Sequence, residues 1–294
     1  PWQVAAVLAL GITYPLLEGA ASWLIVRSRL PGFSLRHGVD NAWMGTFGNV
    51  ICLGAGAVPM QTYYLHLCGL PLGPGVGLMT LQYVFHKTTV LLYATVLLLW
   101  HRSWLAAHTT GVLHYLPAAY AVVAGVIVGL VLLCASPLVQ QLACWALGKL
   151  PRSETWQARR ERWQTQLDTL SAESRHLLAE KRRCLALLAV HGVKLFLLFS
   201  IPYLCIRFMG LPCSLTFGQV QLLGALMFFL SNALPNVAGM GSIETAFLLV
   251  FGCFFSRAQT MSILMLYRIA SYYWVTAASA VGFFGAQRRA QRLV

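Results

Sequence analysis

Four charged side chains lie inside apolar stretches of this sequence and have the chemistry to hold an anionic group. Lys87, Lys194 and Arg268 are cationic, and Glu244 is an isolated carboxylate. An ionised side chain in such a stretch costs several kcal/mol unless a partner or water compensates it. These residues are therefore candidates for function, and a phosphate group is a ligand that such cations are suited to bind.

A purely structural role is the alternative for the same residues. The three cations could instead form ion pairs with Glu244 and Glu18, which would stabilise the fold without contacting a ligand. His86 and His191 also lie in apolar stretches, and we expect them to be core histidines with satisfied hydrogen bonds. An intramembrane transferase is a further alternative, with Glu244 as a base and one of these histidines assisting it.

The composition indicates which elements must position these residues. The chain has 294 residues, of which 58% are hydrophobic and 10% are charged. Soluble domains are typically about 25% charged, so we expect an integral membrane protein. Its apolar runs are long enough to cross about 30 Å of hydrocarbon as helices. The predicted fold class is an all-α polytopic membrane protein.

The apolar runs are of two kinds. Continuous runs predict membrane spans at 2–26, 78–100, 112–135, 185–206 and 258–284. Two others, 42–67 and 215–255, are broken by glycine and proline, and we expect each to be re-entrant or a pair of short spans. Either way, the chain returns to the side from which it came. The segments 71–77, 101–111 and 207–214 are predicted turns or loops.

The part of the chain between the two apolar halves has a different pattern. Residues 136–150 resemble an interfacial helix, and residues 152–183 are polar without Gly or Pro. A seven-residue spacing predicts one amphipathic helix with an apolar stripe formed by Trp156, Trp163, Leu170, Leu177 and Cys184. We expect this helix to pack on the bundle or to lie at the membrane surface.

The basic residues give an orientation. The formal net charge is +13, nine basic residues lie in 149–183, and others lie in 27–37 and in the C-terminal tail. If each broken region returns to its own side, these stretches share one face, which is cytoplasmic in a bacterial-type cell membrane. No nucleic-acid-binding motif accompanies the charge, so we expect no nucleic-acid partner.

Several other functions lack their usual signatures. The eight cysteines occur singly in apolar stretches without metal-binding spacing, so we predict no metal and no other cofactor. There is no Walker loop, Gly-x-Ser-x-Gly or HExxH motif. The chain begins at Pro1, already near a membrane segment, and we expect its natural N-terminus to be missing.

The two broken regions resemble each other, which indicates an internal repeat. Each has an asparagine, a Gln or Glu twelve residues later and a cation in the next span, namely Asn49, Gln61 and Lys87, then Asn232, Glu244 and Arg268. The predicted topology makes the two units an inverted repeat, which is common in alternating-access transporters. We expect one membrane domain over 1–294, with repeats at about 1–100 and 185–294 and a connecting part at about 101–184.

Two signatures around these positions resemble a known family. The first is Pro59-Met60-Gln61-Thr62-Tyr63-Tyr64-Leu65 with Gly69-Leu70, and the second comprises Leu234-Pro235, Gly239-Met240-Gly241-Ser242-Ile243-Glu244 and Arg268-Ile269-Ala270-Ser271-Tyr272-Tyr273. Together they resemble the lysylphosphatidylglycerol synthase transmembrane, flippase-like family over nearly the whole chain. Two departures affect the expected lipid: Gly56-Ala57-Val58 replaces the usual Gly-Gly-Gln, and Asn236-Val237-Ala238 replaces the usual Pro-Gly-Gly.

The resemblance implies the membrane half of the multiple peptide resistance factor, in a stand-alone form without its soluble synthase domain. That half moves aminoacylated phosphatidylglycerol across the bilayer, so the implied function is translocation of an anionic or aminoacylated phospholipid such as lysyl-phosphatidylglycerol. The implied roles are in envelope charge and cationic peptide resistance. The residues expected to bind the lipid are Glu244, Arg268, Lys87, Lys194, Gln61, Asn232, Gly239, Gly241 and Tyr272.

The partners and the alternatives follow from the same resemblance. The expected partner is a membrane phospholipid with an anionic headgroup, and a separate lipid synthase and a homo-oligomer are left open. We expect no enzymatic activity, although the family label suggests a phosphatidylglycerol lysyltransferase. A membrane scaffold without catalysis is the other alternative.

Overall fold

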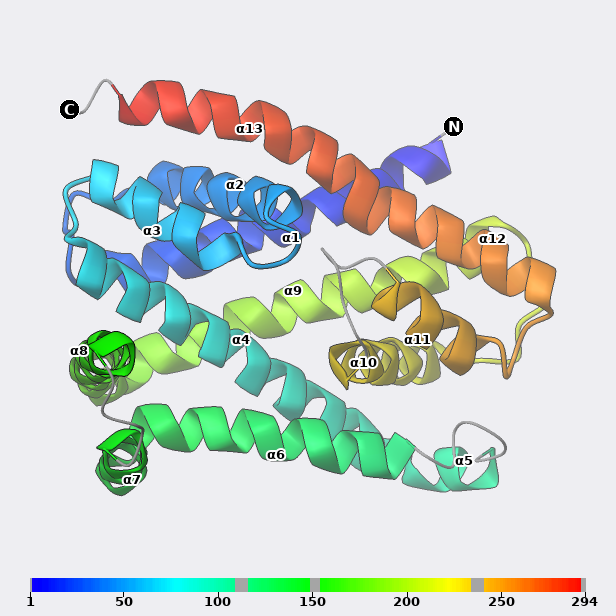
Figure 1. Cartoon of the computed structure of the whole chain (residues 1–294). Helices are drawn as coiled ribbons and strands as arrows, with labels where there is room; N and C mark the ends of the chain where they lie inside the picture. The colour runs from blue at the N-terminus through cyan, green and yellow to red at the C-terminus, as the bar shows by residue number, and fades with distance from the viewer. Residues whose placement is uncertain (1, 109–115, 149–153, 234–240, 292–294) are drawn as a thin grey trace.

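The computed structural model describes residues 2–108, 116–148, 154–233 and 241–291 (Figure 1). Those residues are almost entirely helical, and no strand occurs among them. Three of the described helices are long and apolar enough to cross a membrane, namely α1 (Trp2–Val26), α4 (Leu72–Trp100) and α9 (Lys181–Phe208). The predicted all-α polytopic membrane fold is confirmed.

Most predicted spans have an observed counterpart, but one predicted turn is wrong. α6 (Leu116–Ala135) matches the predicted span 112–135, within its described part. α4 already begins at Leu72, so the predicted turn at 71–77 is helical. Pro74 is tolerated there because the N–H groups of a first helical turn have no partner within the helix.

The last predicted span is a helical rod with a defect in the middle. α12 (Arg257–Arg268) leads into a π-helical turn, η2 (Ile269–Tyr273), and then into α13 (Trp274–Ala290). π-helical turns inside α-helices are rare, and those that do occur often lie at functional sites. The turn begins directly after Arg268 and carries Tyr272, so it places two of the predicted site residues.

Each broken region forms a pair of short helices, which we call the first and the second hairpin. The first consists of α2 (Leu35–Ile51) and α3 (Ala57–Leu67), and the second of α10 (Phe217–Ala233) and α11 (Ser242–Phe251). In the first hairpin, a Cβ at Gly56 would lie only 2.1 Å from the carbonyl oxygen of Gly48. Glycine is therefore required for the two helices to meet at this turn.

Figure 1 shows that the two halves of the chain run in opposite directions. α1 runs from right to left and α4 returns to the right, with the first hairpin between them at the left. α9 runs from left to right and the α12–α13 rod returns to the left, with the second hairpin in the right half. This is the arrangement that the predicted inverted repeat requires.

The connecting part differs from its prediction in two places. α5 (Arg102–Ala107) forms a short helix in the predicted loop 101–111. α8 (Glu154–Ala179) ends before residue 183, and the next residues already belong to α9, so Cys184 does not continue the predicted apolar stripe. On α8 itself, Leu177 is buried, whereas the side chains of Trp156 and Trp163 lie outside the described residues.

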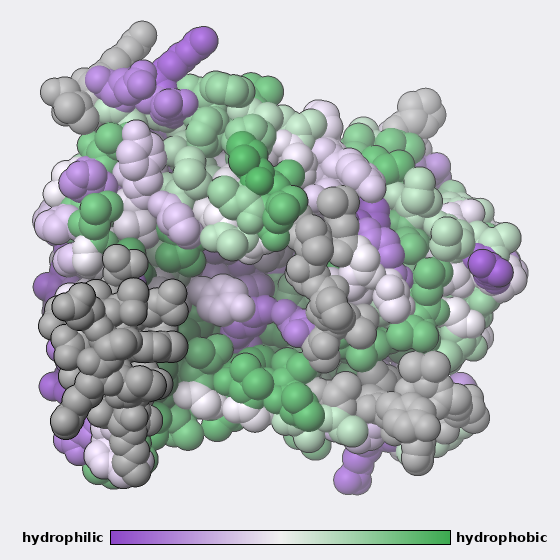
Figure 2. All heavy atoms as spheres, in the orientation of Figure 1, coloured by the Kyte–Doolittle hydropathy of each residue, from purple (hydrophilic) through white to green (hydrophobic). Residues whose placement is uncertain are grey.

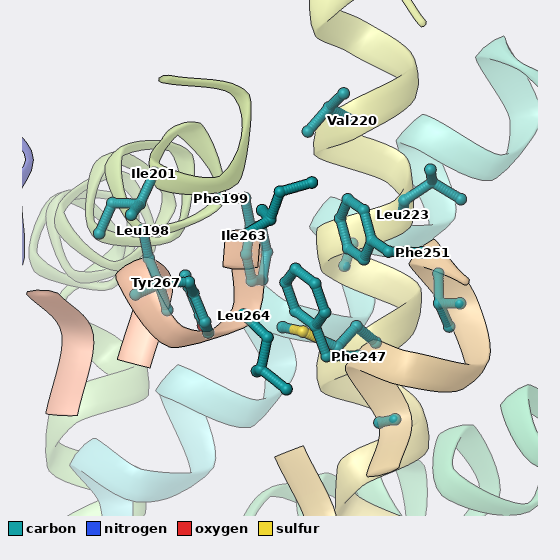
Figure 3. Close-up of a cluster of buried hydrophobic side chains, with 14 of the residues drawn as sticks. Leu198, Phe199, Ile201, Val220, Leu223, Phe247, Phe251, Ile263, Leu264 and Tyr267 are labelled. Carbon is teal, nitrogen blue, oxygen red and sulfur yellow. The ribbon is translucent and has the colours of Figure 1, made fainter. Parts of the chain in front are cut away.

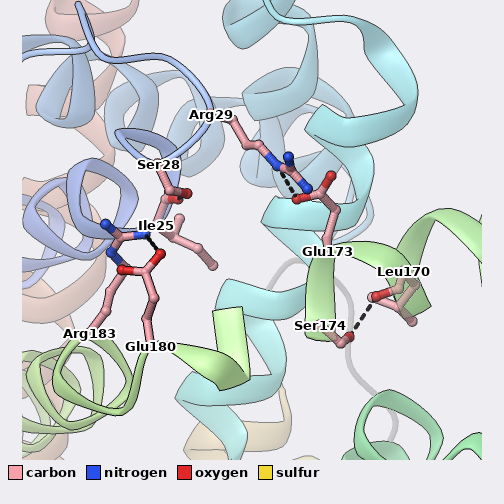
Figure 4. Close-up of polar contacts among 8 residues, drawn as sticks. All are labelled: Ile25, Ser28, Arg29, Leu170, Glu173, Ser174, Glu180 and Arg183. Atoms are coloured by element: carbon pink, nitrogen blue, oxygen red, sulfur yellow. Dashed lines mark hydrogen bonds and ion pairs between the residues drawn. The ribbon is translucent and has the colours of Figure 1, made fainter. Parts of the chain in front are cut away.

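α7 (Pro137–Gly148) and α8 lie at the left end of the molecule in Figure 1. The Nε atom of Arg29, in the loop after α1, lies 3.0 Å from a carboxylate oxygen of Glu173 on α8 (Figure 4). At the same end, Nε of Arg289 near the C-terminus donates a 2.8 Å hydrogen bond to Asp40 on α2. The described parts of the three basic stretches therefore lie at one end of the bundle.

Two hydrophobic clusters stabilise the two halves. One joins α9, α10, α11 and α12, where Phe199, Leu223, Phe247 and Tyr267 interlock (Figure 3). The other joins α1, α3 and α4 with buried residues such as Ile25, Tyr64 and Leu81, and Leu177 of α8 packs against it. In a bilayer such side chains stabilise the bundle through close van der Waals packing, because lipid tails are as apolar as the side chains themselves. Polar groups remain where the two halves meet.

Candidate functional site

A cavity of about 430 Å³ lies between the two hairpins. Its walls come from α1, both helices of the first hairpin, α4, both helices of the second hairpin, η2 and α13. Figure 2 shows a hollow in the middle of one face, with hydrophilic side chains at its floor and hydrophobic ones around it. Backbone breaks at membrane depth are tolerated where they line such a cavity or are buried in protein.

The structure brings four of the predicted site residues to this cavity, namely Gln61, Lys87, Asn232 and Tyr272. Glu244, Arg268, Lys194 and Gly241 are not among the residues that line it. Gly239 lies outside the described residues. The predicted constellation therefore separates into residues that face the cavity and charged residues that lie behind its wall.

Lys87 is the cation that reaches the cavity. It projects from the middle of α4, and its Nζ donates a 2.5 Å hydrogen bond to the side-chain oxygen of Asn232, at the end of α10. The same Nζ lies 5.2 Å from the centre of the Tyr83 ring. No carboxylate of the described residues forms an ion pair with Lys87. Its charge is therefore compensated only by neutral groups.

Lys194 is neutralised by Glu18 beneath the cavity. The lysine side chain on α9 is fully buried, and its Nζ forms an ion pair with one oxygen of the Glu18 carboxylate on α1. The other carboxylate oxygen accepts a 2.6 Å hydrogen bond from Gln82. Gln82 in turn accepts one from Ser22, whose hydroxyl accepts one from Asn41. Glu18 and Gln82 also line the cavity.

Arg268 and Glu244 form another ion pair, in which only the arginine is buried, and their predicted contact is confirmed. Nε of Arg268 lies 2.7 Å from one carboxylate oxygen, and the arginine side chain is only 4% exposed. The second carboxylate oxygen accepts a 2.7 Å hydrogen bond from the N–H of Gly241, directly before α11. Gly241 has a φ of +86°, a conformation that glycine adopts without strain.

The guanidinium of Arg268 also contacts the wall of the cavity. Its Cζ lies 4.1 Å from the centre of the Tyr272 ring, which lines the cavity from η2. Its Nη2 is buried and has no hydrogen-bond partner among the described residues. Structural pairing, the alternative reading, thus describes the contacts of Lys194 and Arg268 but not those of Lys87.

The two histidines do not match the expectation of satisfied core residues. Their rings lie on facing helices with centroids 5.5 Å apart. His191 is fully buried, and neither of its ring nitrogens has a hydrogen-bond partner among the described residues. Nδ1 of His86 likewise has none, and His86 lines the cavity. The packing of α4 against α9 brings the two rings together.

Sequence reasoning missed the polar lining contributed by α1 and α4. Glu18 was expected only as an ion-pair partner, and Gln82 was not singled out at all. The signal for Glu18 was present, because it is one of three carboxylates outside the polar segment 149–183. Gln82 carries no charge, so the apolar run around it offers no comparable signal.

Fold and site together define a class: an integral membrane protein with a polar cavity between two antiparallel helical units. The family model for the transmembrane region of lysylphosphatidylglycerol synthase matches residues 1–279. The chain therefore belongs to this family and is a membrane protein connected with lysylphosphatidylglycerol metabolism. No curated protein and no solved structure matches the chain.

Proposed function

We propose that this protein translocates an anionic or aminoacylated phospholipid, such as lysyl-phosphatidylglycerol, across the membrane. The carrying observation is Lys87, a cation in the cavity between the two hairpins with no carboxylate partner among the described residues. A lipid phosphate is an anion that reaches such a site laterally from the bilayer, and a charge-assisted hydrogen bond from lysine suits it. This activity would change the surface charge of the cell envelope and thereby contribute to resistance against cationic peptides.

The surroundings of Lys87 support the same proposal. Asn232 holds the ammonium group at the meeting point of the two halves, and the amide of Gln61 and the phenol of Tyr272 line the same cavity. These neutral groups offer hydrogen bonds to a headgroup without competing for the charge of Lys87. The Glu18–Lys194 pair joins α1 to α9, and the Glu244–Arg268 pair joins α11 to α12.

The orientation is part of the proposal. We place the end that carries α8, Arg29 and Arg289 in the cytoplasm of a bacterial-type cell, because basic residues gather there. The first hairpin then opens toward the cytoplasm and the second toward the outside. A separate synthase would supply the aminoacylated lipid.

Reconstitution of the purified chain in liposomes tests the proposal. Fluorescent phosphatidylglycerol and aminoacyl-phosphatidylglycerol are expected to cross the bilayer, and Lys87→Gln is expected to slow the transfer at least tenfold, or about 1.4 kcal/mol in barrier terms. Lys181→Gln is the matched control, because Lys181 is exposed at the start of α9. Transfer of neither lipid by well-folded protein would refute translocation and favour a scaffold role.

The same preparation tests the enzymatic alternative. Incubated with charged tRNA and phosphatidylglycerol, this chain is expected to produce no new lipid, because no motif for binding an activated acyl donor was found in it. Aminoacylated lipid formed at enzymatic rates would instead establish a transferase.

A further inference from the structure

We propose that Glu18 and Lys194 form a proton-binding site that is coupled to the anion site at Lys87, so that a proton and an anionic headgroup bind together. The proposal rests on the proposed function, because the anion is the translocated lipid's phosphate. It begins from Glu18, which lines the cavity and is also the ion-pair partner of a fully buried lysine.

In the empty site, the charged form of Glu18 is strongly favoured. One carboxylate oxygen contacts the Lys194 ammonium, and the other accepts a hydrogen bond from Gln82. Both groups stabilise an anion. A proton on Glu18 would leave Lys194 as an uncompensated cation with a side chain that has no exposed surface, which is costly.

An anion in the cavity changes this balance. A headgroup phosphate held by Lys87 would lie in the cavity that Glu18 also lines, so it would repel the Glu18 carboxylate and bring negative charge near its partner Lys194. Glu18 then no longer needs to carry the charge that neutralises Lys194, and it can accept a proton. By linkage, anion binding strengthens proton binding at Glu18, and a proton on Glu18 strengthens anion binding by the same factor.

Glu18 lines the cavity, so a proton can reach it from there, and several charged or titratable groups surround it. The charged and titratable neighbours are Tyr14 on α1, His86 and Lys87 on α4, and His191 and Lys194 on α9. His86 lines the cavity, and its ring lies 5.5 Å from that of His191. Both histidines have ring nitrogens without hydrogen-bond partners among the described residues.

The proton balance of one binding event is simple. The phosphate enters as an anion, and one proton from the bulk solution forms an O–H bond on the Glu18 carboxylate, which lines the cavity. No covalent bond of the lipid breaks. When the headgroup leaves, Glu18 releases the proton and the ion pair with Lys194 forms again.

Proton uptake on lipid binding tests the proposal directly. Purified protein in weakly buffered detergent solution, with a pH-sensitive dye, is titrated with water-soluble dihexanoyl-phosphatidylglycerol while binding is followed by calorimetry. The wild type is expected to take up close to one proton per bound lipid. Its Kd is expected to weaken with rising pH by up to tenfold per pH unit, the limit for one coupled proton.

Variants separate this site from others. Glu18→Gln is expected to bind the lipid without proton uptake and with a Kd independent of pH. Glu180→Gln is the matched control, because Glu180 lies outside the cavity, and it is expected to behave as the wild type.

The wild-type measurement decides the matter even if Glu18→Gln does not fold. Lipid binding without proton uptake and with a constant Kd between about pH 6 and 8 would overturn the coupling and leave the proposed translocation intact. No lipid binding at any pH would overturn the lipid site itself, and the coupling with it.

Discussion

The two hairpins occupy equivalent places in the two halves of the chain but use the equivalent residue differently. In the first hairpin that residue is Gln61, which is neutral, packs against Gly45 and lines the cavity. In the second it is Glu244, which accepts a hydrogen bond from Gly241 and forms an ion pair with Arg268. A carboxylate can neutralise the buried guanidinium of Arg268, whereas an amide offers only hydrogen bonds. The charged position therefore ties one hairpin to α12, and the neutral one lines the cavity.

Glu244→Gln is the strongest test of this difference between the hairpins, and we expect it to cause the largest loss of stability. It leaves the guanidinium of Arg268 buried without a counterion, and the expected loss in the free energy of unfolding is about 3 kcal/mol. In the first hairpin, Gln61→Met removes no charge and should cost less than about 1.5 kcal/mol. Detergent unfolding followed by circular dichroism measures both changes.

Adding Arg268→Gln to Glu244→Gln is the control for this prediction. The double variant removes both charges, so most of the lost stability is expected to return. If the first change alone leaves stability intact, the pair does not hold the second hairpin. If folding is intact but lipid transfer fails in each single variant, the pair acts in transport instead.

A smaller effect is expected from the turn of the first hairpin, which depends on a close backbone contact at a glycine and not on an ion pair. Gly56→Ala would place a Cβ 2.1 Å from the carbonyl oxygen of Gly48, a backbone atom that cannot easily move. We expect a loss of about 1–3 kcal/mol in unfolding free energy, the usual range for overpacking. Gly125→Ala on α6 is the matched control, because nothing lies within 4 Å of the added Cβ. Equal stability of the two variants would show that close contact does not define this turn.

The last prediction concerns the membrane sides to which the two hairpins open, and it involves the smallest change to the protein. Cys253 is exposed between α11 and α12, and Arg175 is exposed on α8 at the opposite end of the bundle. In a variant that keeps only Cys253, an impermeant maleimide should label intact cells, while a single-cysteine variant carrying Arg175→Cys should react only after lysis. Neither change should alter stability or transport. The reverse labelling pattern would invert the proposed orientation.

Ser171 illustrates how the structure sharpens such a test. Sequence alone makes it a natural labelling position on the polar helix. In the structure it is buried, and its hydroxyl donates a 2.8 Å hydrogen bond to Gln140 on α7. Labelling failure at Ser171 would therefore report packing rather than topology, whereas Arg175 has no such burial.

The helical spans, the two broken regions and one ion pair could be predicted from the sequence alone. Continuous apolar runs predict spans because hydrocarbon requires them, and glycines and prolines predict the two broken regions. The approach of Glu244 and Arg268 was also predictable, because both lie in the same half and each carries a charge that requires compensation. The family resemblance pointed to the same positions.

Which of the three predicted cations faces the cavity depends on the tertiary structure. Glu18 and Lys194 pair across 176 positions of the chain, and Lys87 reaches Asn232 across 145. These helices are apolar on nearly every side, so no amphipathic period marks the face that turns toward a partner. Lys87 and Lys194 are equivalent by residue type, but the packing of α1 against α9 pairs Lys194 with Glu18, whereas Lys87 faces the cavity and contacts Asn232.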